Sequence, residues 1–331
     1  MRAISTSGQV VNDDALNPAF LGLFEHMGQP AVDAGDHLVF GDLRIPVCNG
    51  IPRFTQDATY ADNFALLRRA HSKLQLDSVN GTRDRHDTLL RRTAWPPEFF
   101  RGKLVLECGC GAGPDTEVLL SLGARVLSVD LAGVDVAREN VARSPAVQFV
   151  QASIDSLPLR EKSFDVVFCH RVLQHTREPR ATLAHLLRFV KPGGAAFVHS
   201  YSRSPYQMLR WKYALLPLTN KLPPRTLYAI IRAYARPAFH LTNWTSRSRI
   251  GRRFNWVFLP LLNYRRAPKF RNLTDEQMLE YAIHDTFDAL SPTYDRPLGV
   301  EDMRRIAAAC LDQPFEVVDD RTVTLLRTVI R

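Results

Sequence analysis

The 331-residue chain is poor in cysteine and has no long apolar run. Its five cysteines form no C-x-x-C pair, which gives no sign of a disulfide framework and suits free thiols in a reducing compartment. The longest strongly apolar stretch, residues 256–262, is too short to cross a bilayer, and residues 1–10 lack the apolar core of a secretion signal. We therefore expect a cytoplasmic globular protein.

Acidic residues are absent from one long segment. Residues 202–274 contain 15 lysines or arginines and no aspartate or glutamate, so the segment carries +15 while the rest of the +9 chain carries −6. Three of the four tryptophans lie there, and residues 225–236 have the pattern of an amphipathic helix. Such a segment suits an anionic or lipid-linked ligand, an acidic membrane surface or nucleic acid. For the helix at 225–236 alone, a structural role is an equal alternative to ligand binding: its apolar face would pack on the core and its arginines would be solvated.

What the chain does have is a glycine-rich turn after a short apolar run. Residues 104–106 lead into Gly109, Gly111 and Gly113, and Pro114 suits the first turn of a helix. Glycine permits a positive φ and close approach of a nucleoside, and a helix start offers free N–H groups. The spacing G-x-G-x-G differs from the G-x-G-x-x-G of dinucleotide sites, and Glu107 would repel a pyrophosphate. The pattern disfavours a phosphate-bearing cofactor.

A second apolar run, residues 125–129, ends in Asp130, where a doubly wound fold places the acid that accepts ribose hydroxyls. Here the sequence resembles the class I S-adenosylmethionine-dependent methyltransferases of type 11, whose first motif is Glu/Asp-x-Gly-x-Gly-x-Gly and whose second strand ends in an acid. Residues 151–158, 163–168 and 191–194 resemble the family's adenine-binding loop, its fourth strand and the turn into its fifth strand.

The resemblance implies an α/β fold with a Rossmann-like seven-stranded sheet whose last strand is antiparallel. We expect strands at 104–106, 125–129, 147–151, 165–169, 195–200, 315–318 and 322–330, and core helices at 114–122, 134–143, 179–190 and 300–311. The chain divides into a small strand-rich leader (1–56), a helical cap (57–100), the core (101–201 and 296–331) and a basic helical insertion with a substrate segment (202–295).

The leader and the cap carry weaker patterns. Gly41-Asp42 between two apolar runs predicts a hairpin. The Gly-Ile-Pro segment at 50–52 resembles the end of Trm112-type zinc-ribbon-like leaders, but with Cys48 alone a four-ligand zinc site cannot form. In the cap, Gln75, Asp77 and Arg92 are candidate contacts to cofactor or substrate, with solvated helix positions as the alternative.

The resemblance implies S-adenosylmethionine as the cofactor, with contacts at the positions that match the family's motifs: Glu107, Gly109, Cys110, Gly111, Gly113, Asp130, Leu131, Ser153, Ile154 and Asp155. Ser153 stands where similar proteins often carry an acid, so the adenine amine would depend on its hydroxyl, on backbone groups or on Asp155. Arg171 and Gln174 replace the glutamates of metal-using relatives, and we expect no catalytic metal.

Histidines follow the fourth strand and recur in residues 281–295, which resemble an Asp-Thr-Phe-Asp…Ser-Pro-x-Tyr segment of methyltransferases from glycan and natural-product biosynthesis. The candidate bases are His170, His175 and His284, with Asp288 as an orienting group. The candidate substrate contacts are Arg171, Tyr201 and Tyr294. The alternative to a catalytic role is a structural one. His175 would then lie at a helix start, and Asp288 and Ser291 would cap or turn a loop.

The expected reaction is transfer of a methyl group, with oxygen favoured, to a small-molecule, sugar or lipid-linked acceptor of anionic character in a biosynthetic pathway. Peripheral contact with an acidic membrane surface on its inner face is a further expectation from the basic insertion. Two alternatives stay open: an RNA- or tRNA-modifying methyltransferase, although no recognised RNA-binding motif is present, and an S-adenosylmethionine-binding protein that does not methylate.

Overall fold

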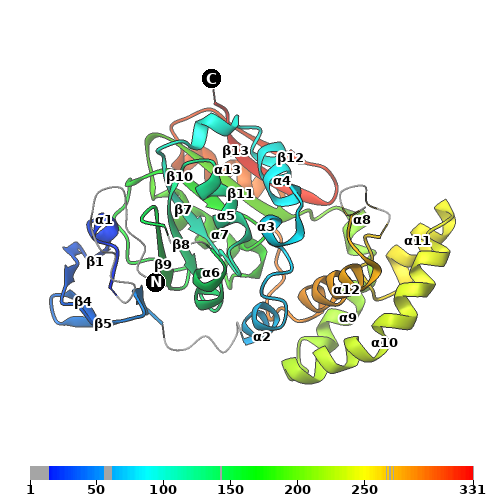
Figure 1. Cartoon of the computed structure of the whole chain (residues 1–331). Helices are drawn as coiled ribbons and strands as arrows, with labels where there is room; N and C mark the ends of the chain where they lie inside the picture. The colour runs from blue at the N-terminus through cyan, green and yellow to red at the C-terminus, as the bar shows by residue number, and fades with distance from the viewer. Residues whose placement is uncertain are drawn as a thin grey trace.

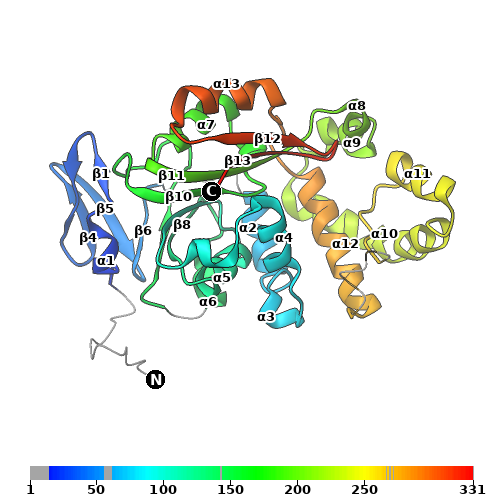
Figure 2. The same ribbon diagram turned by 90° about the horizontal axis from the view of Figure 1, so that it is seen from above.

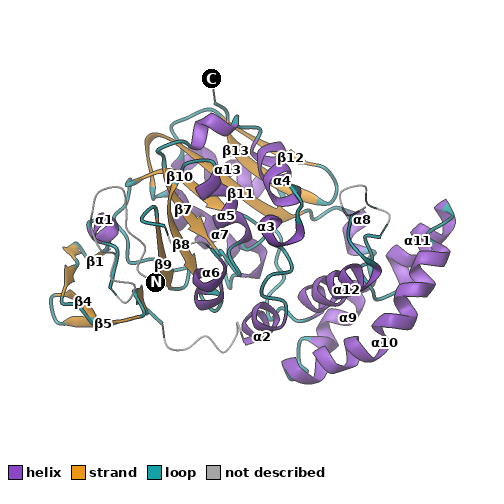
Figure 3. Cartoon of the chain, in the orientation of Figure 1, coloured by secondary structure: helices purple, strands orange, loops and turns teal. Residues whose placement is uncertain are grey.

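A central sheet is flanked by a small β-rich leader at one end and a helical insertion at the other (Figure 1). This computed structural model describes residues 15–55, 62–141, 144–265, 267, 270 and 272–330, apart from the side chain of Tyr206. Within these ranges no helix has both the length and the apolar character that crossing a bilayer requires. Figure 3 shows the strands gathered in the centre and the leader, with helices around them.

The central sheet has seven strands in the order β12-β13-β11-β10-β7-β8-β9. Its members are β7 (Leu104–Cys108), β8 (Arg125–Asp130), β9 (Val147–Gln151), β10 (Phe164–Cys169), β11 (Val190–Tyr201), β12 (Phe315–Asp319) and β13 (Val323–Thr328). β13 runs antiparallel to both of its neighbours, and the other neighbouring pairs are parallel. The predicted sheet with an antiparallel last strand is confirmed, and its carboxyl ends form the edge where open α/β sheets bind ligands.

Helices cover both faces of the sheet, which explains its continuous apolar strands. α7 (Pro179–Leu187) and α13 (Val300–Cys310) lie on one face, and α4 (Asp84–Thr93), α5 (Pro114–Ser121) and α6 (Val134–Asn140) lie on the other (Figure 2). Side chains alternate between the faces: Val166 packs into the α5 side and Val167 into the α7 side. The two cores hold the strand ends in fixed positions.

The fifth strand departs from the prediction. Residues 191–194 do not form a turn that precedes it but an irregular part of β11, because Phe164 pairs with Val190 whereas Val166 pairs with Ala195. Gly193 adopts a φ of +74°, and Lys191 forms an ion pair of 2.7 Å with Asp165 on β10. The extra residues are therefore accommodated as a bulge at the edge opposite the ligand side.

The leader contains α1 (Pro18–Leu21), β1 (Glu25–His26), β2 (Gln29–Pro30), β3 (Val32–Asp33), β4 (His37–Phe40), β5 (Leu43–Cys48) and β6 (Ile51–Pro52). The predicted hairpin is confirmed: Phe40 pairs with Leu43 across a turn in which Gly41 has a φ of +58°. Phe20 and Phe24 are fully buried in the same hydrophobic core as α7 and the sheet, so the leader is fixed to the core domain.

The cap contains α2 (Asp62–Ala70), α3 (Asp77–Asn80), α4 and a 3₁₀ turn, η2 (Pro97–Phe100). Asp77 does not face the ligand side. Its carboxylate accepts hydrogen bonds from the Thr82 hydroxyl at 2.6 Å and from the backbone N–H of His86 at 3.0 Å, so it joins α3 to α4. The hypothesis that Asp77 contacts the cofactor or substrate is replaced by a capping role.

The insertion forms a helical layer of its own: α8 (Pro205–Met208), α9 (Trp211–Thr219), α10 (Pro224–Thr245), α11 (Arg249–Phe258) and, after the acid-free segment, α12 (Asp275–Leu290). The predicted amphipathic helix is present in α10, which buries Leu227 and Ile231 against α12, although Ile230 is exposed. Acids of α12 neutralise part of the basic charge: Arg236 pairs with Glu276 at 2.9 Å and Arg265 with Asp275 at 2.6 Å.

Candidate active site

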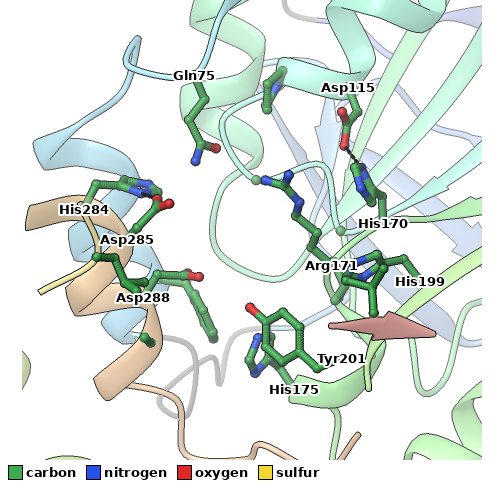
Figure 4. Close-up of a pocket in the computed structure, with 18 of the residues that line it drawn as sticks. Gln75, Asp115, His170, Arg171, His175, His199, Tyr201, His284, Asp285 and Asp288 are labelled. Atoms are coloured by element: carbon green, nitrogen blue, oxygen red, sulfur yellow. Dashed lines mark hydrogen bonds and ion pairs between the residues drawn. The ribbon is translucent and has the colours of Figure 1, made fainter. Parts of the chain in front are cut away.

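A cavity of about 500 Å³ opens at the carboxyl ends of the central strands. The glycine turn after β7 forms one wall, the cap contributes Gln75 and Arg92, and the insertion and α12 form the opposite wall. Figure 4 shows Asp115, His170 and Arg171 facing His284, Asp285 and Asp288 across this space. Three parts of the chain that are distant in sequence therefore meet in one site.

The glycine turn needs its glycines. Gly109 has a φ of +86°, and a Cβ there would lie 2.2 Å from Cγ2 of Val172. Gly113 has a φ of +91°, and its Cβ would lie 2.7 Å from Cγ2 of Val141. Gly109, Cys110 and Gly111 line the cavity, whereas Gly113 lies behind it. Gly113 thus serves the packing of the turn, and the other two glycines keep the cavity wall free of side chains.

Asp130 organises this turn from the end of β8. Its Oδ1 accepts the backbone N–H groups of Ala132 and Gly133, each at 2.8 Å, and its Oδ2 accepts the N–H of Gly111 at 2.9 Å. Because a carboxylate has about four acceptor positions, roughly one stays open toward the cavity. Asp130 lines the cavity beside Leu131 and Ile154, so the three residues predicted around the nucleoside lie together.

Glu107 does not line the cavity. It is buried, and its Oε2 accepts hydrogen bonds from the hydroxyls of Thr116 and Ser128, both at 2.6 Å. Burial raises the pKa of Glu107 to about 8. The two hydrogen bonds act to lower this pKa, and the negative charge of Asp115 acts to raise it. Glu107 therefore joins β7, α5 and β8 inside the core, and the prediction that it contacts the cofactor is corrected to a structural role.

The predicted adenine loop is only partly at the cavity. Ala152 and Ile154 line it, but Ser153 and Asp155 do not. The Ser153 hydroxyl accepts the backbone N–H of Asp155 at 3.3 Å, and the Asp155 carboxylate accepts the Thr182 hydroxyl at 2.5 Å. Both polar side chains are thus used to shape the loop, and the apolar ones are presented to the ligand.

His170 belongs to a closed network. Its Nδ1 lies 2.7 Å from Oδ2 of Asp115 and its Nε2 lies 2.6 Å from Nη1 of Arg92. Burial lowers the pKa of His170 to about 4 although Asp115 opposes the shift. Both ring nitrogens are engaged, so His170 is poorly placed to take a proton from a substrate.

Asp115 is a site residue that the sequence analysis missed. It lines the cavity, and its Oδ1 is buried without a hydrogen-bond partner among the described residues. Burial would raise its pKa, but His170 and the arginines nearby hold the pKa below its usual range, so the group is a carboxylate. The available signal was its position in the first turn of the helix that follows the glycines.

His284 and Asp285 form a pair on α12. Nδ1 of His284 lies 2.7 Å from Oδ1 of Asp285. Although burial alone would raise it, the pKa of Asp285 is lowered by this hydrogen bond, so the carboxylate accepts from Nδ1–H of His284, whose Nε2 makes no hydrogen bond with any described residue. Asp288 lies one turn further along the same cavity face. Contrary to the loop alternative, residues 281–290 are helical because a Thr274–Gln277 capping box starts α12 before them.

His175 is the other candidate base that remains at the cavity. Its Nδ1 donates to the backbone carbonyl of Tyr294 at 3.0 Å, and burial lowers its pKa, which keeps the ring neutral. Tyr201 lines the cavity beside it, with ring centroids 5.9 Å apart. Tyr294 itself does not line the cavity, and its link to the site is the carbonyl group that holds the His175 ring.

Several arginines line the cavity without an ion pair to any described acid, and two of them, Arg171 and Arg210, lie on opposite sides of it. Arg171, which follows β10 with a strained φ of +65°, makes no hydrogen bond or ion pair with any described residue and extends between the two walls (Figure 4). Arg210 reaches the cavity from the insertion, with its guanidinium 4.2 Å from the Trp256 ring centre and a buried Nε that lacks a hydrogen bond. Lys212, by contrast, is paired with Asp295 at 2.6 Å.

The strands at the centre of this fold match a known protein family. A family described as "Methyltransferase domain" matches residues 106–198, from β7 to β11. The chain is 32% identical over 150 residues to the demethylmenaquinone methyltransferase of Clavibacter sepedonicus, covering 42% of this chain and 61% of that protein. It is 36% identical over 109 residues to the ubiquinone biosynthesis O-methyltransferase of Albidiferax ferrireducens, covering 31% and 43%. Residues 106–198 therefore form a methyltransferase domain, and its relatives support the class I S-adenosylmethionine-dependent type.

Solved structures with this methyltransferase fold give weaker likenesses. The magnesium protoporphyrin IX methyltransferase of Synechocystis PCC 6803, with bound S-adenosylhomocysteine, covers 84% of this chain and 90% of its own at 15% identity and a TM-score of 0.38. A methyltransferase of Methanococcus maripaludis covers 84% and 97% at 11% identity and a TM-score of 0.40. Both TM-scores lie below 0.5, and the resemblance of the leader to Trm112-type proteins is not confirmed.

The methyltransferase domain fits its cofactor at the glycine turn. The open acceptor position of Asp130 suits a ribose hydroxyl, and Leu131 and Ile154 offer apolar surface to the adenine. The unpaired Oδ1 of Asp115 suits the ammonium group of the methionine part, because an ionised acceptor buried without a partner favours a cationic donor. Within the described residues no three His, Cys, Asp or Glu side chains gather as a metal site.

Proposed function

We propose that this protein transfers a methyl group from S-adenosylmethionine to a hydroxyl oxygen of a small biosynthetic acceptor that carries an anionic group. The observation that carries the proposal is the convergence, in the cavity beyond the glycine turn, of a proton-accepting pair (His284 and Asp285) with two cations that have no acidic partner among the described residues (Arg171 and Arg210). One of the relatives is named an O-methyltransferase of ubiquinone biosynthesis, which agrees with oxygen as the acceptor atom.

The His284–Asp285 pair provides the base. The bound cofactor supplies an activated sulfonium methyl group, so the protein needs only to orient the acceptor and to remove its proton. Nε2 of His284 accepts the hydroxyl proton, and the Asp285 carboxylate, 2.7 Å from Nδ1, fixes the tautomer and stabilises the imidazolium. S-adenosylmethionine bound at the glycine turn would supply its methyl group to the deprotonated acceptor oxygen and leave as S-adenosylhomocysteine.

Arg171 and Arg210 provide the anion site. Arg171 lies on the cofactor side, two residues after the end of β10, and Arg210 lies on the insertion side, against Trp256. A carboxylate or phosphate between them would satisfy both guanidinium groups, which suit planar, bidentate recognition of such groups. This arrangement would place the acceptor between the glycine turn and α12, with its hydroxyl turned toward His284.

The test uses S-adenosylmethionine with an isotopically labelled methyl group and a panel of hydroxylated carboxylates and phosphates, each paired with its neutral ester or amide. The proposal predicts label on oxygen, with the charged member of a pair methylated faster than the neutral one. Label on nitrogen or on RNA, or equal rates for charged and neutral members, would contradict it. Cofactor binding without transfer to any compound would support a binder that does not methylate.

Two variants separate the roles of the residues. His284→Asn should lower kcat by about 10²- to 10⁴-fold, the usual contribution of a general base, and leave affinity for S-adenosylhomocysteine unchanged. Arg171→Leu should raise KM for the acceptor by at least about tenfold, because an anion would lose a charged hydrogen-bond donor. Arg304→Leu, an exposed arginine on α13 that pairs with Glu301, is the matched control and should change neither parameter.

A further inference from the structure

The outward face of α11 is apolar and uncovered. Ile250, Phe254 and Phe258 lie one helical turn apart and are 82%, 48% and 64% exposed. The inward face does the packing: Asn255 donates to the Thr242 carbonyl at 3.2 Å, and Trp256 lines the cavity. No residue of α11 is fully buried.

Cations border this face. Arg247, Arg249 and Arg253 are exposed and form no ion pair with any described residue, unlike the insertion arginines that pair with α12. Trp244, near the end of α10, is 65% exposed beside them in sequence. Since residues 202–274 contain no acid, nothing within the segment opposes this positive charge. Large apolar side chains next to unpaired arginines are the composition of a helix that lies in a membrane interface.

The position of α11 leaves this face accessible. Figures 1 and 2 show α11 at the end of the molecule farthest from the leader, projecting beyond the sheet. Its inward residue Trp256 reaches the cavity while its outward residues face solvent, so one helix connects the cavity wall with the outer surface.

We propose that α11 and the end of α10 dock on an anionic lipid surface. Ile250, Phe254 and Phe258 enter the interfacial layer, and Arg247, Arg249 and Arg253 contact acidic headgroups. Lipid is favoured over nucleic acid because an aliphatic side chain as exposed as Ile250 gains nothing from stacked bases, whereas it gains from leaving water. It is favoured over a second copy of the chain because the arginines would repel one another across a symmetric contact. The proposal does not depend on the methyl acceptor.

The experiment is co-sedimentation of the full chain with large vesicles of phosphatidylcholine, with and without about one third phosphatidylglycerol. The wild type should bind the anionic vesicles at least about tenfold more tightly than the neutral ones, with affinity that falls as salt is raised. The double variants Phe254→Ser/Phe258→Ser and Arg249→Glu/Arg253→Glu should each lose at least about tenfold in affinity. Circular dichroism and S-adenosylhomocysteine binding verify that both remain folded.

A matched control lies at the other end of the molecule. Val32→Ser/Arg44→Glu removes one exposed apolar and one exposed basic residue of the leader and should bind vesicles as the wild type does. Equal binding to neutral and anionic vesicles, or full binding by both α11 variants, would overturn the proposal. So would salt-dependent binding of single-stranded RNA without vesicle binding, or a dimer in solution that Phe254→Ser/Phe258→Ser abolishes.

Discussion

Asp130→Asn tests the role of the residue on which the glycine turn and the nucleoside both depend. In the wild type, three backbone N–H groups donate to the carboxylate at 2.8 to 2.9 Å. An asparagine amide in either orientation turns an N–H group toward at least one of these donors and removes the charge. A hydrogen bond to a charged group contributes about 1.5–3 kcal/mol, so affinity for S-adenosylhomocysteine should fall by about 10- to 100-fold.

The assay is isothermal titration calorimetry at fixed salt, supported by thermal denaturation of the unbound protein. Asp135→Asn is the matched control: Asp135 lies on α6 beside the same turn and pairs with Arg53 at 2.6 Å, outside the cavity. This control should retain wild-type affinity. If Asp130→Asn is folded and binds S-adenosylhomocysteine as tightly as the wild type does, the assignment of the cofactor site to this turn is refuted.

Three further predictions concern the core, the turn and metal dependence. Because burial raises the pKa of Glu107 from 4.5 to about 8, the folded protein holds this proton more tightly between these values. The free energy of unfolding of the wild type, relative to that of Glu107→Gln, should therefore be highest below pH 4.5 and should fall by about 1–4 kcal/mol as the pH rises through 8. Denaturation of both proteins at several pH values measures this difference, and a difference that does not change with pH would contradict the prediction. Gly109→Ala should lower Tm and abolish S-adenosylhomocysteine binding, whereas Gly299→Ala, whose added Cβ meets nothing within 4 Å, should do neither. Methyl transfer should continue in the presence of EDTA. Activity that EDTA abolishes and that returns only with Mg²⁺ would disprove the prediction that no catalytic metal is needed.

The sequence predicted the fold well because the relevant signals are local. Apolar runs ending in glycine or aspartate identify β7 and β8, and an amphipathic pattern identifies α10. The same local signals failed where a side chain's direction or partner matters. The position of Glu107 in the motif does not show that its side chain faces α5. Strand alternation does indicate it, because the neighbouring side chains of Leu106 and Cys108 point to the other face of the sheet.

The active-site network depends on contacts that are distant in sequence. His170 meets Arg92 and Asp115 across 78 and 55 residues, so its engaged ring nitrogens could not be read from its neighbours in the chain. The arginines of the insertion find acids on α12 only through the packing of α10 against it. The helical state of residues 281–290 was readable, however, because Thr274 and Gln277 have the spacing of a capping box.

We expect one cavity to hold the cofactor at the glycine turn and to present its methyl group to the His284 wall. A crystal structure with S-adenosylhomocysteine tests it most directly. In that structure we expect a ribose hydroxyl on Asp130, adenine between Leu131 and Ile154, and the sulfur turned toward the space between Arg171 and His284. A nucleoside bound elsewhere, or a sulfur that faces away from α12, would contradict it.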